Sequence, residues 1–294
     1  MPDPDPASPN IKTMTRCTII IPAYNEAAVI EAVVNKLRAA RPHDEILVID
    51  DGSSDATAPL AQKAGARVIH HKYNMGYGAS LKTGMRHAAS DTLVFFDGDG
   101  QHNPQDIQKL IDQLESNDMV VGARPKGSGA ISRRSGKWFL YRVAEYLVGR
   151  KIPDLNSGLR TLRRSLALEL IHLLPNGFSL TTTITLAMMS LGYQVEYVPI
   201  QIQERSGKST VSIRDFFRTI MLILRMITLF APLKIFIPTA ITLAFIAIPS
   251  LTYDLLHTNI SDTTVVLWLF CLIIFLFGLL ADSISVANRK GTKQ

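Results

Sequence analysis

Cysteine is nearly absent from this sequence of 294 residues. The two cysteines, Cys17 and Cys271, stand in different contexts and do not show the spacing of metal ligands. A disulfide framework and a zinc site are therefore both disfavoured. The first residues, MPDPDPASPN, have no apolar core, so they predict a disordered tail and not a signal peptide.

Two further absences narrow the class of protein. No G-x-G-x-x-G motif follows the first predicted strand, which argues against a dinucleotide-binding dehydrogenase. The net charge is only +6, and we expect no nucleic-acid partner. The hydrophobic content of 47% points to membrane segments instead.

Two long runs contain no charged side chain. They cover residues 235–253 and 263–281, each 19 residues long. As a helix, such a run spans roughly 28 Å, which is close to the hydrocarbon thickness of a bilayer. We therefore expect a transmembrane hairpin. The alternative is a buried helical hairpin of a soluble domain.

The charges that flank these runs predict their orientation. The connecting loop, residues 254–262, carries two aspartates and no lysine or arginine, whereas basic residues precede the first run and follow the second. Both ends of the hairpin are therefore expected on the cytoplasmic side, with only a short loop outside.

The stretch that precedes the first run is amphipathic. Between residues 209 and 230, apolar residues recur at helical spacing, with arginines on the other side. This pattern predicts an interfacial helix that lies on a membrane. The alternative is a core helix of the amino-terminal domain.

The first 125 residues alternate between strand and helix patterns. Apolar strands are expected at residues 16–21, 45–49, 67–70, 92–96 and 119–121. Apolar strands separated by helices predict an α/β fold with a mostly parallel sheet that is covered on both faces. Ligands of such sheets bind outside the carboxyl ends of the strands.

Two aspartates follow the fourth predicted strand, in the sequence FFDGDGQH. Asp97 and Asp99 are separated only by Gly98. Repulsion and desolvation oppose this arrangement unless a cation or another strong partner compensates. The pair is therefore a candidate site for a hard divalent cation. The alternative is a solvated Asp-Gly turn.

Four motifs, in order, resemble a known family. IIIPAYNE, ILVIDDGSSD, NMGYGASLKTG and VFFDGDGQH resemble the family-2 glycosyltransferases with the Rossmann-like GT-A fold. VVGAR, DLNSGLR, GYQVEYVPIQIQERSGKST and the two apolar runs resemble the polyprenyl-phosphate branch, which includes dolichyl-phosphate mannose synthases and bacterial undecaprenyl-phosphate glucosyltransferases. The Q-x-x-R-W motif of processive polysaccharide synthases is not matched by QERS at residues 203–206.

The resemblance implies a division of the chain into five parts. These are a disordered tail (1–14), a GT-A catalytic domain (15–208), an interfacial helix (209–231), a two-span hairpin (232–285) and a basic cytoplasmic tail (286–294).

The implied activity is an inverting, metal-dependent transfer of one sugar. The donor would be a nucleotide sugar of the UDP-glucose or GDP-mannose type, the acceptor a polyprenyl phosphate, and the cofactor Mg²⁺ or Mn²⁺. The protein would be a multi-pass cell-membrane protein with its catalytic domain in the cytoplasm, and a homo-oligomer is possible. The alternatives are transfer to a lipid without phosphate, a nucleotidyltransferase, and a membrane scaffold without activity.

The resemblance also implies a metal and donor site. Asp97, Asp99 and Gln101 would hold the cation, whereas His102 is either a further ligand or a contact at a helix start. The residues expected to contact the donor are Pro22, Tyr24, Glu26, Ile49, Asp51, Asp97, Gly98 and Asp99.

A glycine-rich loop follows the third predicted strand. Asn74, Gly76 and Gly78 allow either a close approach of the backbone to the donor or a simple turn.

Arginine positions match those that bind phosphate groups in the lipid-phosphate enzymes, where a bidentate fork suits a phosphate. The residues expected at the acceptor phosphate are Arg124, Arg133 or Arg134, Arg205 and Lys208. The alternative is a basic face that attracts anionic lipid.

Asp154, in DLNSGLR, matches an aspartate proposed as the catalytic base in relatives. A phosphate monoester has a second pKa of about 6 and is already largely anionic at neutral pH, so Asp154 either acts as a base or orients the acceptor. The resemblance gives catalytic roles to Asp99, Asp154, Arg124 and Arg205. Leu159 stands where the relatives typically have an aromatic residue.

Overall fold

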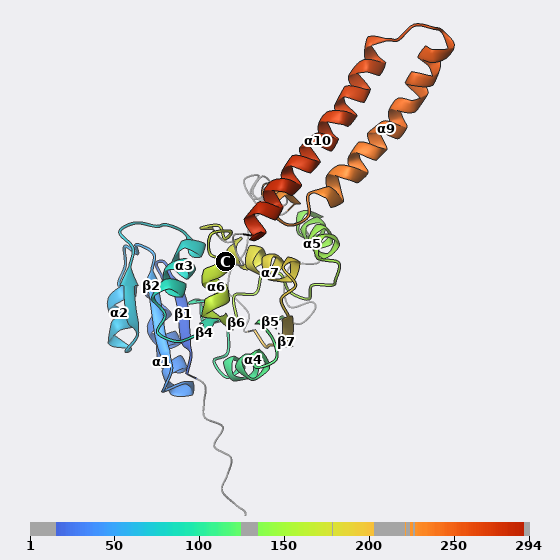
Figure 1. The fold of residues 1–294 in the computed structure, drawn as a ribbon. Helices are drawn as coiled ribbons and strands as arrows, with labels where there is room; N and C mark the ends of the chain where they lie inside the picture. Colours follow the sequence, from blue (N-terminus) through green and yellow to red (C-terminus); the bar gives the residue numbers. More distant parts are fainter. Residues whose placement is uncertain are drawn as a thin grey trace, which may run out of the picture.

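The structure is a computed structural model (Figure 1). It describes residues 16–124, 135–177, 179–202, 221, 224–225 and 227–290.

A seven-stranded sheet forms the centre of the amino-terminal domain, with the strand order β3-β2-β1-β4-β6-β5-β7. Its strands are β1 (Thr18–Ala23), β2 (Glu45–Asp50), β3 (Arg67–His70), β4 (Thr92–Phe95), β5 (Met119–Ala123), β6 (Arg160–Arg163) and β7 (Val195–Pro199). The five strands predicted from the apolar runs are β1 to β5, and the predicted α/β fold is confirmed.

Strand β6 runs antiparallel to both of its neighbours, β4 and β5, whereas the other pairs in the sheet are parallel. The apolar pattern did not predict β6, because its sequence, RTLR, begins and ends with arginine. Because β6 is reversed, the residues that precede it reach the same edge of the sheet as the carboxyl ends of β4 and β5.

Alternating side chains of the strands belong to two apolar layers, one on each face of the sheet, as expected for a sheet covered on both faces. Ile20, Leu47 and Phe95 belong to one layer, and Ile19 and Val48 to the other. The first layer is covered by α3 (Tyr77–His87), α5 (Ser135–Val148), α6 (Arg164–Leu170) and α7 (Leu180–Ser190). The second is covered by α1 (Ile30–Ala40), α2 (Thr57–Lys63) and α4 (Asp106–Leu114).

A helical hairpin, α9 (Leu233–Leu256) and α10 (Asp262–Lys290), projects away from the α/β domain, with α5 near its base (Figure 1). Both helices are long and apolar enough to cross a membrane, and only 11% and 17% of their most apolar windows are buried. Apolar side chains that are mostly exposed to the surroundings fit a lipid-facing hairpin better than the core of a soluble domain.

Small residues recur every seventh position where the two helices meet. The buried positions are Ala240, Ala247 and Asp254 on α9, and Thr264, Cys271, Gly278 and Ser285 on α10. Small side chains allow the two backbones to approach closely.

The stretch predicted as an interfacial helix lies largely outside the described residues. Its described residues, apart from the last, Ala231, are helical. Met221 and Leu224 are exposed, whereas Ile227 and Phe230 are buried in the layer formed by α3, α5, α6 and α7. The end of this stretch therefore packs on the amino-terminal domain, and the interfacial placement of the rest stays a prediction.

Candidate functional site

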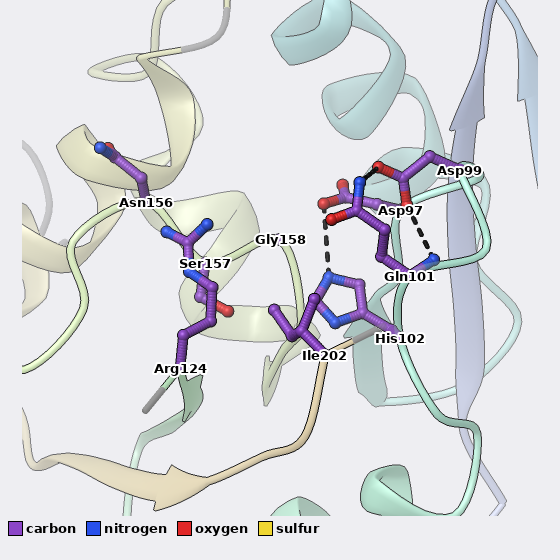
Figure 2. A pocket seen from close by; sticks show the side chains of 9 residues that line it. All are labelled: Asp97, Asp99, Gln101, His102, Arg124, Asn156, Ser157, Gly158 and Ile202. Atoms are coloured by element: carbon purple, nitrogen blue, oxygen red, sulfur yellow. Dashed lines mark hydrogen bonds and ion pairs between the residues drawn. The ribbon is translucent and has the colours of Figure 1, made fainter. Parts of the chain in front are cut away.

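One polar pocket, with a volume of about 250 Å³, lies at the edge of the sheet where β4 and β5 end and the chain enters β6. Figure 2 shows the acidic residues on one side and an arginine on the other. The lining residues are Asp97, Asp99, Gln101, His102, Arg124, Asn156, Ser157, Gly158 and Ile202. Motifs that are far apart in the sequence, FFDGDGQH, VVGAR and DLNSGLR, therefore meet in one site.

Asp97 is fixed by two neighbours. The hydroxyl of Tyr77 donates to its Oδ1 at 2.9 Å, and Nε2 of His102 lies 3.4 Å from its Oδ2. Burial opposes ionisation of Asp97, but these two contacts and the positive charge of Arg160 outweigh it, so that its pKa lies below the ordinary value. Burial and the adjacent Asp97 raise the pKa of Tyr77 well above its ordinary value, which keeps that hydroxyl a donor.

Gly158 packs directly against the carboxylate of Asp97. A Cβ atom at this position would overlap the carboxylate carbon and both of its oxygens. The glycine of the DLNSGLR motif therefore allows the loop before β6 to contact the acidic pair.

Asp99 and Gln101 form a short turn beside Asp97. The backbone N–H and the side-chain amide of Gln101 donate to the Asp99 carboxylate at 3.1 and 2.5 Å. The amide oxygen of Gln101 points toward the carboxylate of Asp97 (Figure 2). This arrangement of oxygen ligands suits a hard cation, which would supply the missing positive charge.

Asp97, Asp99 and Gln101 therefore fit the predicted cation site, although Gln101 offers an amide oxygen and not a carboxylate. No group of three or more His, Cys, Asp or Glu side chains in metal-binding arrangement occurs within the described part of the chain. His102 is buried, and its Nδ1 has no hydrogen-bond partner among the residues described. Its role as a metal ligand stays a prediction.

Arg124 and Asp154 form a bidentate ion pair. Nε and Nη2 of Arg124 donate to the two carboxylate oxygens at 2.6 and 2.9 Å. The hydrogen bonds to Asp154 are the main cause of the raised pKa of Arg124, and burial opposes them. Asp154 is 2% exposed and also accepts from the backbone N–H of Asn156 at 3.1 Å. This geometry fits an orienting role for Asp154, because its oxygens are already engaged.

Among the described residues, one group of Arg124 is unpaired. Its side chain is 30% exposed and lines the pocket, and its Nη1 has no partner in the described part of the structure. The guanidinium is therefore held by Asp154 along one edge and offers the remaining donors to a ligand.

Asn156, which the sequence did not single out, also lines the pocket. The hydroxyl of Thr182, on α7, donates to its side-chain oxygen at 2.7 Å. The amide nitrogen of Asn156 is thereby left available as a donor in the pocket. Its position within DLNSGLR, between the predicted Asp154 and Gly158, could have pointed to it.

Arg160 is a fully buried cation behind the site. Its Nη1 donates to the carbonyl of Thr181 at 2.8 Å, and its Nη2 donates to the carbonyl of Ser157 at 2.5 Å. Burial lowers its pKa, which the negative charges of Asp97 and Asp154 partly oppose. Arginine is seldom fully buried, so composition and spacing gave no reason to expect it there.

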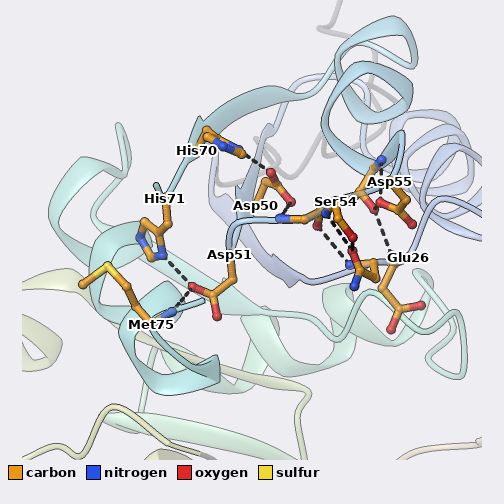
Figure 3. Close-up of polar contacts among 11 residues, drawn as sticks. Glu26, Asp50, Asp51, Ser54, Asp55, His70, His71 and Met75 are labelled. Carbon is orange, nitrogen blue, oxygen red and sulfur yellow. Dashed lines mark hydrogen bonds and ion pairs between the residues drawn. The ribbon is translucent and has the colours of Figure 1, made fainter. Parts of the chain in front are cut away.

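Among the predicted donor residues, Asp51 organises a neighbouring loop. It accepts from Nδ1 of His71 at 2.7 Å and from the backbone N–H groups of Met75 and Gly76 at 2.9 and 2.8 Å (Figure 3). The sequence analysis missed His71, which is buried. A donor contact of Asp51 stays a prediction, and its oxygens retain limited capacity for further hydrogen bonds.

The remaining donor candidates lie along the carboxyl ends of β1 and β2. Tyr24 is 48% exposed, directly after β1. Glu26 lies at the start of the turn that leads into α1, where its backbone N–H donates to Thr57. Pro22 and Ile49 are partners in the β1–β2 register, and the Ile49 side chain is fully buried in the core. Ile49 could therefore reach a donor only through its backbone.

The glycines of NMGYGASLKTG have a structural explanation. A Cβ atom at Gly76 would lie 2.6 Å from the carbonyl oxygen of Asn176, and one at Gly78 would lie 2.7 Å from the carbonyl oxygen of Gly177. Gly76 also has a φ of 102°, which L side chains rarely adopt. Because Gly76 and Gly78 have no side chain, the segment before α7 can pack directly against them. The close approach that these glycines allow is therefore an approach between two stretches of protein backbone.

Four predicted acceptor residues fall outside the described residues. These are Arg133, Arg134, Arg205 and Lys208. Of the predicted phosphate-binding group, only Arg124 is placed, and it lies in the pocket.

Two family models match the chain. The model of glycosyl transferase family 2 matches residues 18–171, and the model of the GtrB C-terminal hairpin matches residues 231–287. The first match covers the sheet up to β6 and includes every described residue that lines the pocket except Ile202.

Three curated relatives match between 67% and 94% of the chain. It is 31% identical over 229 residues to the polyprenol monophosphomannose synthase of Mycolicibacterium smegmatis, which covers 71% of this chain and 84% of that protein. It is 29% identical over 213 residues to the undecaprenyl-phosphate mannosyltransferase of Micrococcus luteus, covering 67% and 88%. It is 28% identical over 293 residues to glycosyltransferase AglJ of Haloferax volcanii, covering 94% and 96%.

Solved structures share the fold at lower identity. A glucosyl-3-phosphoglycerate synthase from Mycobacterium tuberculosis, in complex with Mn²⁺, uridine diphosphate and glucosyl-3-phosphoglycerate, aligns with a TM-score of 0.59 and 20% identity. The alignment covers 74% of this chain and 80% of that one.

Proposed function

The chain belongs to glycosyl transferase family 2, and on this premise we propose that it transfers one sugar from a nucleotide sugar to a polyprenyl phosphate. The motif resemblance pointed to this family, and the match to the family model confirms it. Two of the relatives named above are described as a polyprenol monophosphomannose synthase and an undecaprenyl-phosphate mannosyltransferase, which supports the proposed acceptor.

The observation that carries the proposal is the division of one pocket into two sides. Asp97, Asp99 and Gln101 present oxygens on one side, and the guanidinium of Arg124 lies on the other (Figure 2). A nucleotide sugar carries a diphosphate that a cation can neutralise on the acidic side. A lipid phosphate needs fixed cationic donors, which Arg124 supplies.

The reaction follows from the chemistry of the two substrates. A phosphate oxygen of the lipid attacks the anomeric carbon of the sugar, a new carbon–oxygen bond forms, and the bond to the nucleoside diphosphate breaks. The pair of electrons leaves with the diphosphate, and direct displacement inverts the anomeric centre. Because the attacking phosphate is already largely anionic at neutral pH, no general base is required.

The residues of the chain then have distinct tasks. Asp154 holds Arg124 in a fixed orientation, so the arginine loses little freedom when a phosphate binds. Tyr77 and Gly158 fix the carboxylate of Asp97. The amide of Asn156, oriented by Thr182, is placed to donate to a sugar hydroxyl or a phosphate oxygen.

We further propose that a divalent cation binds at Asp97, Asp99 and Gln101. When bound, Mg²⁺ or Mn²⁺ would stabilise the negative charge of the departing diphosphate. The oxygens of these three side chains, which line one side of the pocket, support this assignment, and so does the structural neighbour crystallised with Mn²⁺ and uridine diphosphate.

The membrane arrangement is likewise a proposal. α9 and α10 would cross the bilayer, with the catalytic domain and both termini in the cytoplasm. The acidic connecting loop and the basic flanks support this orientation, and the match to a family C-terminal hairpin supports the two spans.

The test is an incubation of membranes that contain the full chain with a panel of labelled nucleotide sugars, followed by extraction of the lipids. We expect one donor to label an acid-labile lipid, and we expect excess EDTA to abolish the labelling. Asp99→Asn should lose activity by at least a hundredfold, because a neutral amide does not balance the cation. The control Asp112→Asn, on α4, should retain it.

Folded, membrane-inserted protein that labels no lipid with any donor would contradict the proposed function. Full activity in EDTA would contradict only the cation.

A further inference from the structure

The outer surface of α3 carries cations that pair with no acidic side chain among the described residues. α3 contains Lys82 and Arg86 and no aspartate or glutamate. Arg164, at the start of α6, donates to the carbonyls of Met85 and Arg86 at 3.0 and 2.9 Å. The positive charge of Arg164 therefore lies at the carboxyl end of α3.

Arg225, just before the hairpin, joins this group. Its Nη2 donates to the carbonyl of Leu173 at 3.0 Å, and Nζ of Lys82 donates to the side chain of Asn176 at 2.8 Å. Both cations are therefore tethered to the same short segment before α7. Burial lowers the pKa of Lys82, and the charges of Arg86 and Arg225 lower it further, as expected for cations that crowd one another.

The cationic patch, defined as Lys82, Arg86, Arg164 and Arg225, differs from the opposite side of the domain. None of its members takes part in an ion pair within the described part of the chain. On α2 and α4, in contrast, Lys63 pairs with Glu31 at 3.2 Å and Lys109 pairs with Asp106 at 2.6 Å. Unpaired cations gathered on one face create a positive potential that attracts anions.

The location of the patch indicates which anions it meets. The helical layer that contains α3 and α6 also buries Ile227 and Phe230, and it packs against Ile235 and Phe236 at the base of α9. The hairpin thus leaves the domain from the layer that carries the patch. If the hairpin crosses a bilayer, this layer is the part of the domain nearest to the headgroups.

We propose that the cationic patch binds anionic phospholipid headgroups and holds the α3–α6 side of the catalytic domain against the membrane. This contact is separate from the pocket, and it rests on the membrane placement of the hairpin proposed above. It would restrict the tilt of the domain and so keep the pocket at a constant height relative to a lipid-borne phosphate.

The test places a fluorophore on α3 of the full chain in lipid nanodiscs. His87→Cys provides an exposed labelling site, because the two native cysteines are buried. Quenching by a headgroup-attached nitroxide then reports contact with the bilayer. The discs contain either zwitterionic lipid alone or about one third anionic phosphatidylglycerol, a fraction high enough to give a negative surface potential.

We expect strong quenching only in the anionic discs, and a loss of quenching at about 0.5 M salt, where surface charges are screened. Lys82→Gln with Arg86→Gln should shift the contact equilibrium by about fivefold for each cation removed. Arg86→Gln alone provides the same test if the double variant folds poorly. The matched control, Lys36→Gln with Lys63→Gln on the opposite side, should quench like the parent.

Equal quenching in zwitterionic discs, or in the double variant, overturns the proposal while the hairpin still holds the chain in the disc. Loss of quenching on addition of inorganic phosphate at constant ionic strength also overturns it, since the patch would then be a site for free anions. A chain that does not co-elute with the discs at all overturns the membrane placement as well.

Discussion

Gly158 shows how a single residue can be dictated by a contact far away in the sequence. A Cβ atom at this position would overlap the Asp97 carboxylate, so any side chain would displace either that carboxylate or the loop that carries Gly158. The motif resemblance drew attention to DLNSGLR, but it gave no reason for the glycine. The reason lies in the fold, because the reversed strand β6 brings this loop to the acidic pair.

We predict that Gly158→Ala disturbs the acidic pair more than it disturbs the fold. The added methyl group must push the Asp97 carboxylate aside, and overpacking of this kind costs about 1–3 kcal/mol. Affinity for a nucleoside diphosphate with Mn²⁺, measured by calorimetry, should fall about tenfold or more. The control Gly177→Ala, whose Cβ would meet no heavy atom within 4 Å, should bind like the parent. Unchanged affinity in Gly158→Ala would remove Asp97 from the diphosphate site.

Residues with unusual chemistry were predictable from the sequence, and residues that support them were not. Asp97, Asp99 and Arg124 were predicted for the site and lie in one pocket. Tyr77 and Arg160 were not predicted, since a buried tyrosine or arginine next to an acidic residue leaves no local pattern. Their roles depend on which elements the fold brings together.

At the scale of elements, apolar runs predicted the parallel strands and the two long helices, because these features have a strong local signal. The apolar pattern did not predict strand β6, because this strand is short and carries arginines at both ends. The hairpin helices are longer than the uncharged runs on which the prediction of two spans was based. α9 and α10 extend beyond the uncharged runs and include Lys234, Asp254, Asp262 and Asp282.

The heptad pattern of small residues makes a prediction about the hairpin. A Cβ atom at Gly278 would lie 2.7 Å from Cβ of Phe236, so Gly278→Leu should force α9 and α10 apart. At about 1–3 kcal/mol for overpacking, the midpoint of thermal unfolding in detergent should fall by roughly 2–10 °C. Ser283→Leu, at an exposed position on α10, is the control and should unfold at the parent temperature. An unchanged midpoint for Gly278→Leu would show that the helices do not pack along this seam.

At the scale of the whole molecule, the catalytic domain and the hairpin form a connected structure. Lys234, at the start of α9, donates to the carbonyl of Leu147 at 2.8 Å, and the hydroxyl of Tyr146 donates to the carbonyl of Lys234 at 3.0 Å. Ser285 on α10 donates to the carbonyl of Leu229 at 2.7 Å. These contacts, together with the buried Ile227, fix the base of the hairpin to the helical layer above the sheet. The pocket is therefore held in a defined relation to the two long apolar helices, as transfer to a lipid-borne acceptor would require.

The most direct measurement compares two acceptors that differ only in their phosphate. The purified chain, in one detergent and with its identified nucleotide sugar, is assayed for initial rate with a polyprenyl phosphate and with the polyprenol of the same chain length. We predict rapid formation of an inverted glycosyl phosphate with the first acceptor. With the second, the rate should be at least a hundredfold lower, because the alcohol neither pairs with Arg124 nor is anionic at neutral pH. A comparable rate with the polyprenol would contradict the proposed transfer to a lipid phosphate and favour a lipid acceptor without phosphate.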